Sequence, residues 1–274
     1  MKRYYKRVFY ITGEKRCPVR VSVRLPTGSC RGGCWFCCSK FWTGYKGHSL
    51  RQELTENEFL EVWKNAFSGN WLGIWLQEEV KRAVEGQGWL RFVREDLFEP
   101  TINRITKEVL SSCHRSGCGL LVKTSRIAVF QWFEELKEIK HHIVFDISPL
   151  LEDWREKVKI VNFLVNEGLR VALGLAPICA FTPEVAEILE TIDRRIVGVW
   201  VGWLHGSAHW FPPSALKSVP RRFVHSERQY NIGYLAEIVR KIEEITSKRG
   251  LPLNFYFTSA FHRAGSCCFV GSKQ

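Results

Sequence analysis

The feature that most constrains the fold is the recurrence, along nearly the whole chain, of a short apolar segment followed by amphipathic helical periodicity. Apolar segments with the composition of strands lie at 18–26, 89–93, 118–125, 141–149, 169–177, 195–204 and 251–261. Helical segments separate them at 54–67, 74–86, 100–117, 129–140, 151–168, 182–192 and 234–250. Apolar strands that alternate with helices are typical of a parallel sheet covered by helices.

About seven evenly spaced strands favour a barrel or partial barrel over a small flavodoxin-like sheet. The sequence therefore predicts the α/β class, with one partial (β/α) barrel domain over residues 19–274 and a basic N-terminal extension over 1–18. In such folds the chemistry lies after the carboxyl ends of the strands, so functional residues are expected there.

The charge of the chain favours an anionic partner. Lys and Arg number 40 against 28 Asp and Glu, a formal net charge of +12. The excess is concentrated at 1–7, 14–20 and 219–229, which predicts a nucleic acid or nucleotide-like partner or, equally, ordinary solvated surface. No apolar window of about 18 residues and no secretory leader are present, so we expect a cytoplasmic protein with no membrane partner and with reduced thiols.

Four cysteines crowd into the segment "LPTGSCRGGCWFCC" (25–38), directly after the first expected strand. In a reducing compartment closely spaced cysteines are more often metal ligands or catalytic groups than disulfide halves. Cys30, Cys34 and Cys37 could hold zinc, with Cys38, Cys17 or a histidine as fourth ligand. They could equally hold a 4Fe-4S cluster with one iron left without a protein ligand. The spacing alone does not separate these two kinds of site.

The Cys30-x3-Cys34-x2-Cys37 spacing after the first strand, with the aromatic Phe36 before the third cysteine, resembles the radical S-adenosylmethionine (SAM) superfamily. The resemblance implies that these cysteines hold a 4Fe-4S cluster whose open iron is chelated by SAM. It also implies reductive cleavage of SAM to a 5′-deoxyadenosyl radical that abstracts hydrogen, with electrons from a flavodoxin- or ferredoxin-like donor. Cys38 is then a neighbour of the cluster rather than a ligand.

A narrower resemblance, over about 21–177, is to spore photoproduct lyase and the related DNA repair photolyase-like radical SAM proteins. The segment "REDLFEPT" keeps an Asp, an aromatic and a proline of their pattern but has Leu97 at the first proline; "VKTS" and "FDIS" resemble later strand ends. The resemblance implies that Asp96 or Glu95 holds the ammonium of SAM, Lys123 its carboxylate, and Ser148 its carboxylate or ribose. Phe36 would face the cofactor. The implied SAM-binding set is therefore Phe36, Glu95, Asp96, Lys123 and Ser148.

One departure concerns the hydrogen donor. Spore photoproduct lyases carry a cysteine three residues before that Asp, where this chain has Val93, so thymine-dimer repair by that route is not expected. Cys179 after an expected strand, or Cys267 and Cys268 near the end of the sequence, are candidate catalytic thiols; a small hydrophobic role is the alternative for each. The last two, or Cys17, could also bind a second cluster.

The remaining candidates are histidines and a second thiol pair. His205 and His262 both follow expected strands and could contact substrate or carry a proton; His262 is favoured because Arg263 beside it could bind an anionic group. Cys113 and Cys118 flank a helix end and are expected to be structural.

The sequence thus favours a radical SAM enzyme of unassigned reaction type that acts on a nucleic acid or nucleotide. The alternative is a non-catalytic nucleic-acid-binding protein stabilised by zinc or a cluster.

Overall fold

The computed structural model describes residues 8–11, 19, 21–26, 54–69, 77–92, 96–203 and 232–255. In these ranges the chain forms a sheet of eight strands whose order in space is their order in sequence. The strands are β1 (Phe9–Ile11), β2 (Val21–Val23), β3 (Trp89–Phe92), β4 (Gly119–Thr124), β5 (His141–Ile147), β6 (Val171–Ile178), β7 (Val199–Trp203) and β8 (Leu253–Phe255). β1 is antiparallel to β2, and every later neighbouring pair is parallel.

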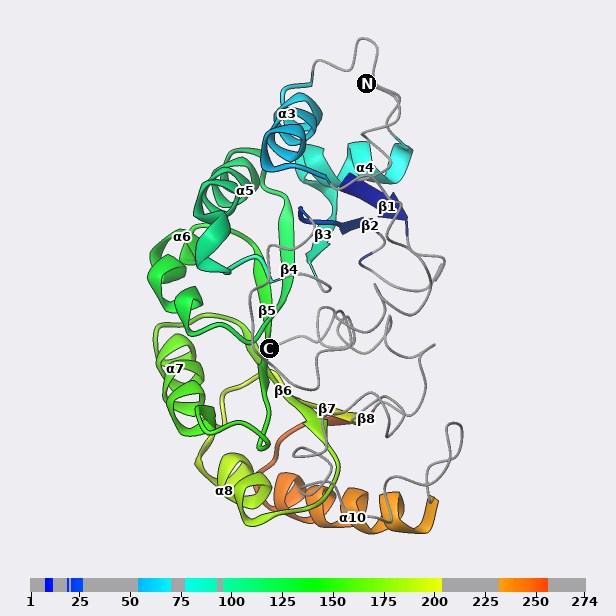
Figure 1. The fold of residues 1–274 in the computed structure, drawn as a ribbon, viewed down its shortest axis with the longest axis vertical. Helices are drawn as coiled ribbons and strands as arrows, with labels where there is room; N and C mark the ends of the chain where they lie inside the picture. Colours follow the sequence, from blue (N-terminus) through cyan, green and yellow to red (C-terminus); the bar gives the residue numbers. More distant parts are fainter. Residues whose placement is uncertain are drawn as a thin grey trace.

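The helices lie along the convex side of the curved sheet (Figure 1). They are α3 (Glu56–Phe67), α4 (Glu78–Arg82), α5 (Asn103–Ser116), α6 (Phe133–Lys137), α7 (Trp154–Asn166), α8 (Pro183–Thr191) and α10 (Ile232–Lys248). α3 begins at a capping box: the Thr55 hydroxyl accepts from the Glu58 amide at 3.3 Å, and the Glu58 carboxylate accepts from the Thr55 amide at 2.8 Å. This reciprocal pairing satisfies two helix-end donors.

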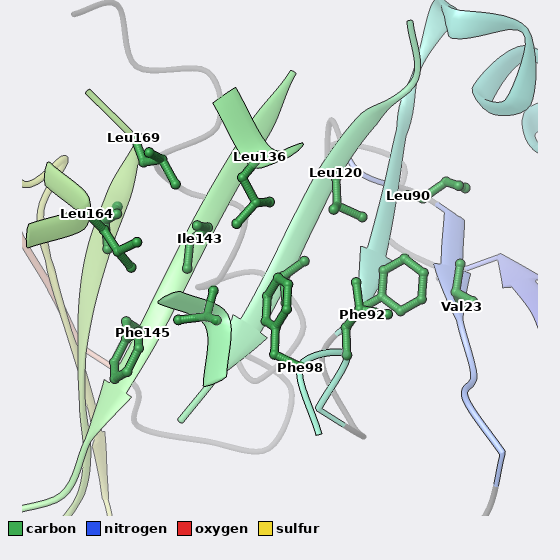
Figure 2. Close-up of a cluster of buried hydrophobic side chains, with 14 of the residues drawn as sticks. Val23, Leu90, Phe92, Phe98, Leu120, Leu136, Ile143, Phe145, Leu164 and Leu169 are labelled. Carbon is green, nitrogen blue, oxygen red and sulfur yellow. The ribbon is translucent and has the colours of Figure 1, made fainter. Parts of the chain in front are cut away.

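The main core lies between the helices and the convex face of the sheet. Alternate strand residues such as Leu120, Ile143 and Phe145 point to this side and meet Leu136 and Leu164 from the helices (Figure 2). All five are completely buried. Because successive side chains of a strand point to opposite faces, this packing leaves the intervening residues on the concave face.

The concave face, here called the inner face, carries a smaller and more polar set of side chains. Leu121, Val144, Ala172 and Trp200 form its apolar layer. Next to this layer Arg91 is 2% exposed and donates from Nε to the Ser22 hydroxyl at 3.0 Å. The inner face therefore holds buried polar groups beside its small apolar layer.

The predicted class is confirmed: the chain is a single α/β domain with a mostly parallel, helix-covered sheet. Three details differ from the sequence prediction. β1 was not predicted and lies inside the segment expected as a basic extension, with Val8 and Phe9 buried. The helices expected at 74–86 and 129–140 are described as α4 followed by a wider turn, and as α6 preceded by a 3-10 segment. Within the described ranges no helix is both long and apolar enough to cross a bilayer.

Candidate ligand-binding site on the inner face of the sheet

The carboxyl ends of β3 to β6 bring four sequence-predicted residues to one edge of the sheet. Asp96 follows β3, Lys123 is the last residue but one of β4, Ser148 follows β5 and Cys179 follows β6. Parallel strands align these ends side by side, which is why residues more than 80 positions apart in sequence gather here.

Asp96 holds the end of β4 in place. Its carboxylate accepts the Thr124 hydroxyl at 2.7 and 2.9 Å, the Ser125 amide at 2.9 Å and the Phe98 amide at 3.1 Å. Burial raises the pKa of Asp96, and these hydrogen bonds together with the charge of Arg126 oppose the rise. The carboxylate is thus engaged by its own chain, and a role in binding a ligand ammonium stays a prediction.

Ser148 connects the ends of β5 and β6. Its hydroxyl donates to the Pro177 carbonyl at 3.2 Å and accepts from the Leu150 amide at 3.2 Å. The residue is 3% exposed. In this structure the hydroxyl orders the edge of the sheet, and its proposed contact with a ligand stays a prediction.

Lys123 is the central group of the site. Its Nζ lies 3.1 Å from Asp146 Oδ2, and 4.1 Å from the ring centroid of Trp200. Lys123 is on β4 and Trp200 on β7, so the curvature of the sheet and the small residues Ala172 and Gly174 on the strand between them let the two side chains meet. A cation between a carboxylate and an aromatic face is stabilised from two sides.

Asp146 is packed against β6. A side chain at Gly174 would overlap Asp146 Oδ1, so only glycine fits there. Oδ1 is buried and has no hydrogen-bond partner among the described residues, whereas Oδ2 faces Lys123. Burial raises the pKa of Asp146 to about 6, with Lys123 opposing the rise and Asp96 adding to it.

The chemistry available at this place follows from the donor set. Lys123 and Asp146 are each about one-fifth exposed, so a ligand on the inner face can reach them. An ammonium can bind a carboxylate or phosphate, and a carboxyl with a pKa near 6 can accept or donate a proton at neutral pH. We name Lys123, Asp146 and Trp200, with Gly174 beneath, the inner-face cluster.

Several predicted residues lie outside the described ranges: Cys17, Cys30, Cys34, Phe36, Cys37, Cys38, Glu95, His205, His262, Cys267 and Cys268. Their roles stay predictions. Among the described residues no group of three or more His, Cys, Asp or Glu side chains is arranged to hold a metal ion.

The described thiols are buried. Cys179 is 2% exposed, and burial raises its pKa to about 11, so it stays a neutral thiol. Cys113 and Cys118 are free thiols, both fully buried, and contact with Cys118 raises the pKa of Cys113. The structural role predicted for this pair agrees with their burial.

Asp146, Trp200 and Gly174 were not predicted from the sequence. A signal for Asp146 was present: it is the one acidic residue within the apolar run "HHIVFDIS", and it lies two positions before Ser148, hence on the same face of the strand. Trp200 gave no such signal because its partner lies three strands away.

No protein-family model matches the sequence, and no curated protein matches it. Among solved structures, a variant of spore photoproduct lyase superposes with a TM-score of 0.51 over 91% of this chain and 79% of that chain, at 14% identity. The chain shares its fold with spore photoproduct lyase. At this identity the likeness concerns the fold alone, and it confirms the predicted partial barrel.

Two structures of SuiB from Streptococcus suis also match, one of them bound to S-adenosylmethionine. Their TM-scores are 0.45 and 0.44 at 12% identity over 66% of this chain. The chain spans 42% of the length of SuiB, so the activity of the whole SuiB protein is not transferred to it.

Proposed function

We propose that this protein is a radical SAM enzyme in which Cys30, Cys34 and Cys37 hold a 4Fe-4S cluster with one open iron. The observation that carries the proposal is the position of the Cys30-x3-Cys34-x2-Cys37 motif in the sequence. It follows β2, the first parallel strand of a sheet shared with spore photoproduct lyase. When bound, the cluster supplies the electron that cleaves SAM.

The edge of the sheet fits the amino-acid part of SAM in its donor chemistry. That part is zwitterionic, and the inner-face cluster offers its carboxylate an ammonium at Lys123, whose side chain is about one-fifth exposed. Lys123 would bind the carboxylate of SAM, while Asp96 and Ser148 would keep the ends of β4, β5 and β6 in register around it. Phe36 and Glu95 complete the proposed set.

The proposed substrate is a nucleic acid or nucleotide, and the reaction type is left unassigned. The net charge of +12 supports an anionic substrate. Binding of this kind weakens steeply with salt, because each phosphate contact releases counterions. A flat salt response would count against this substrate class.

One anaerobic experiment tests the enzyme. The protein is purified and reconstituted, iron and sulfide are measured, and dithionite and SAM are added before 5′-deoxyadenosine is quantified. We expect stoichiometric iron and sulfide and SAM-dependent 5′-deoxyadenosine. Zinc without sulfide, or a cluster that never cleaves SAM, supports instead a non-catalytic metal-stabilised nucleic-acid-binding protein.

A matched pair of cysteine variants tests the three-ligand model. Cys34→Ala should lose the cluster and all cleavage. Cys38→Ala removes a thiol four positions away in the same segment and should keep most of the iron. Equal loss of iron in both variants would show that the ligand set is wrong.

A further inference from the structure

The inner-face cluster is electrically balanced before any ligand binds. Lys123 Nζ lies 3.1 Å from Asp146 Oδ2, and the other side of the ammonium faces the Trp200 ring at 4.1 Å. The ammonium therefore has a carboxylate partner in the structure already. A ligand anion that approaches Lys123 meets the negative charge of Asp146 as well.

A third charge in this place would be poorly compensated. Trp200 is 2% exposed, and Gly174 and Ala172 line the neighbouring strand without polar side chains. The side chains of Lys123 and Asp146 are about four-fifths shielded from water, so two anions sharing one ammonium would repel each other strongly. Neutralisation of one anion by a proton removes that repulsion.

We propose that the inner-face cluster is an anion-binding site in which Asp146 takes up one proton from solvent when a ligand carboxylate or phosphate binds Lys123. In this step the carboxylate of Asp146 takes up one proton from solvent and becomes a carboxylic acid, and no other bond forms or breaks. The acid then offers an O–H donor beside the Lys123 ammonium, so the bound anion gains two donors.

The charged groups around Asp146 favour this coupling. Lys123 faces it from β4, Asp96 acts on it from the segment after β3, and Lys157 acts on it from α7. From β6 the neighbour is Gly174, which carries no side chain. Lys123 and Lys157 lower the pKa of Asp146, and burial and Asp96 raise it, with a net result of about 6. Diversion of Lys123 toward a ligand anion weakens the main lowering influence and raises the pKa further.

The ligand class is an anion of carboxylate or phosphate type, and two probes distinguish its source. SAM presents an amino-acid carboxylate, and that arm rests on the proposed function. Thymidine 5′-monophosphate presents a phosphate and does not depend on SAM chemistry. Both are titrated into the reconstituted full-length protein by calorimetry at pH 7, in buffers of different ionisation enthalpy, which gives the number of protons taken up.

For at least one probe we expect the wild type to take up close to one proton more than Asp146→Asn. The amide cannot ionise and mimics the neutral acid in shape and donor capacity, so this variant should bind that probe as tightly as the wild type at pH 6 and more tightly at pH 8. The wild-type affinity should fall by up to about tenfold per pH unit above pH 7. Lys123→Met should lose binding at every pH.

The controls separate this coupling from general effects. Asp193→Asn removes a surface carboxylate that is paired with Arg195, and it should leave the proton count unchanged. Gly174→Ala adds a side chain beneath Asp146 Oδ1 and should weaken binding if Asp146 must keep its place. Circular dichroism and melting of each variant identify any that fail to fold.

The outcomes are distinct. Equal proton uptake by wild type and Asp146→Asn, weaker binding by Asp146→Asn at pH 8, or binding of neither probe above the Lys123→Met level would each overturn the proposal. The proposed function is judged separately, by iron, sulfide and 5′-deoxyadenosine. SAM cleavage without a proton count that depends on Asp146 would leave the enzyme standing and remove only the coupling.

Discussion

At the scale of single residues, two adjacent histidines at the start of β5 have opposite surroundings. His142 is fully buried on the inner face, and neither ring nitrogen has a hydrogen-bond partner among the described residues. His141 next to it accepts the Arg170 amide at 2.9 Å, and its Nδ1 lies 3.0 Å from the Ile139 carbonyl oxygen. Their substitutions should therefore have different consequences.

We expect His142→Leu to leave the free energy of unfolding unchanged or to raise it by about 1 kcal/mol, because it removes an unpaired buried polar group. His141→Leu should lower it by about 1–3 kcal/mol, because the Arg170 amide loses its acceptor. Urea unfolding at pH 7.5 measures both. Destabilisation of similar size in the two variants would contradict the difference inferred from their contacts.

The burial of His142 also leads us to expect that the stability of the protein depends on pH. Burial, with the charges of Arg170 and His141, lowers the pKa of His142 from 6.5 to about 3. Below pH 6.5 the unfolded chain therefore binds a proton that the folded chain does not, and stability falls as the pH falls toward 3. This contribution of His142 changes the free energy of unfolding by at most about 1.4 kcal/mol per pH unit.

Unfolding curves of wild type and His142→Leu between pH 7.5 and 4 should reveal the contribution of His142 to this pH dependence. The wild type should lose more stability on acidification than the variant does. Asp146 acts in the opposite direction, since its raised pKa favours the folded state as the pH falls below about 6, but it is common to both proteins and cancels in their difference. Parallel curves would show that His142 is protonated in the folded state.

At the scale of elements, the wider turn that follows α4 is fixed against the end of α5 by one glycine. Gly86 has a φ of +85°, and a side chain there would overlap the carbonyl oxygen of Ser116. Gly69, after α3, has a φ of +70° with no atom within 4 Å of the place of a side chain. Both positions favour glycine by backbone conformation, but only the first also requires close approach.

We expect Gly69→Ala to cost about 1 kcal/mol of unfolding free energy, from the left-handed backbone alone. Gly86→Ala should cost at least about 2 kcal/mol, because α4 or α5 must also shift. Chemical denaturation compares the two. A cost for Gly86→Ala no larger than that for Gly69→Ala would mean that the two helices move apart without penalty.

The elements also show how far sequence reasoning reaches. Helical and strand periodicities predicted all seven parallel strands, since each buried strand is a compact apolar run. β1 was not predicted, because three residues among basic neighbours are too few to show a strand periodicity. The strand is stabilised by pairing with β2 rather than by its own propensity. The candidate site was predicted in part: the positions of Asp96, Lys123 and Ser148 at strand ends follow from topology.

The partners of those residues could not be predicted from the sequence. The register of neighbouring strands decides that Thr124 donates its hydroxyl hydrogen bond to Asp96. It also decides that the Pro177 carbonyl accepts from Ser148. The meeting of Lys123 with Trp200 depends on the curvature of the sheet over β5 and β6. Such contacts follow from tertiary packing and leave no local pattern in the chain.

At the scale of the whole molecule, the middle of the sheet should be its most stable part. β5 and β6 are seven and eight residues long and lie between other strands, whereas β1 and β8 are three residues long and lie at the ends of the described strand order. Cooperative units with many buried contacts open only with global unfolding.

Native-state hydrogen exchange with mass spectrometry should therefore show the slowest amides in β4 to β6, with exchange rates that track global stability in added denaturant. Amides of β1 and β8 should exchange faster and depend less on denaturant, because they open locally. Uniform protection across all eight strands would mean that the sheet opens as one unit.

The strand order β1 to β8 also has a consequence for synthesis. Each strand pairs with the strand made just before it, so no strand of the described sheet must wait for a segment far downstream. During translation the chain emerges from its N-terminal end, and segments fold as they become available. The strand with which each new strand pairs has thus already been synthesised, and the sheet can grow on the ribosome by one strand and one helix at a time.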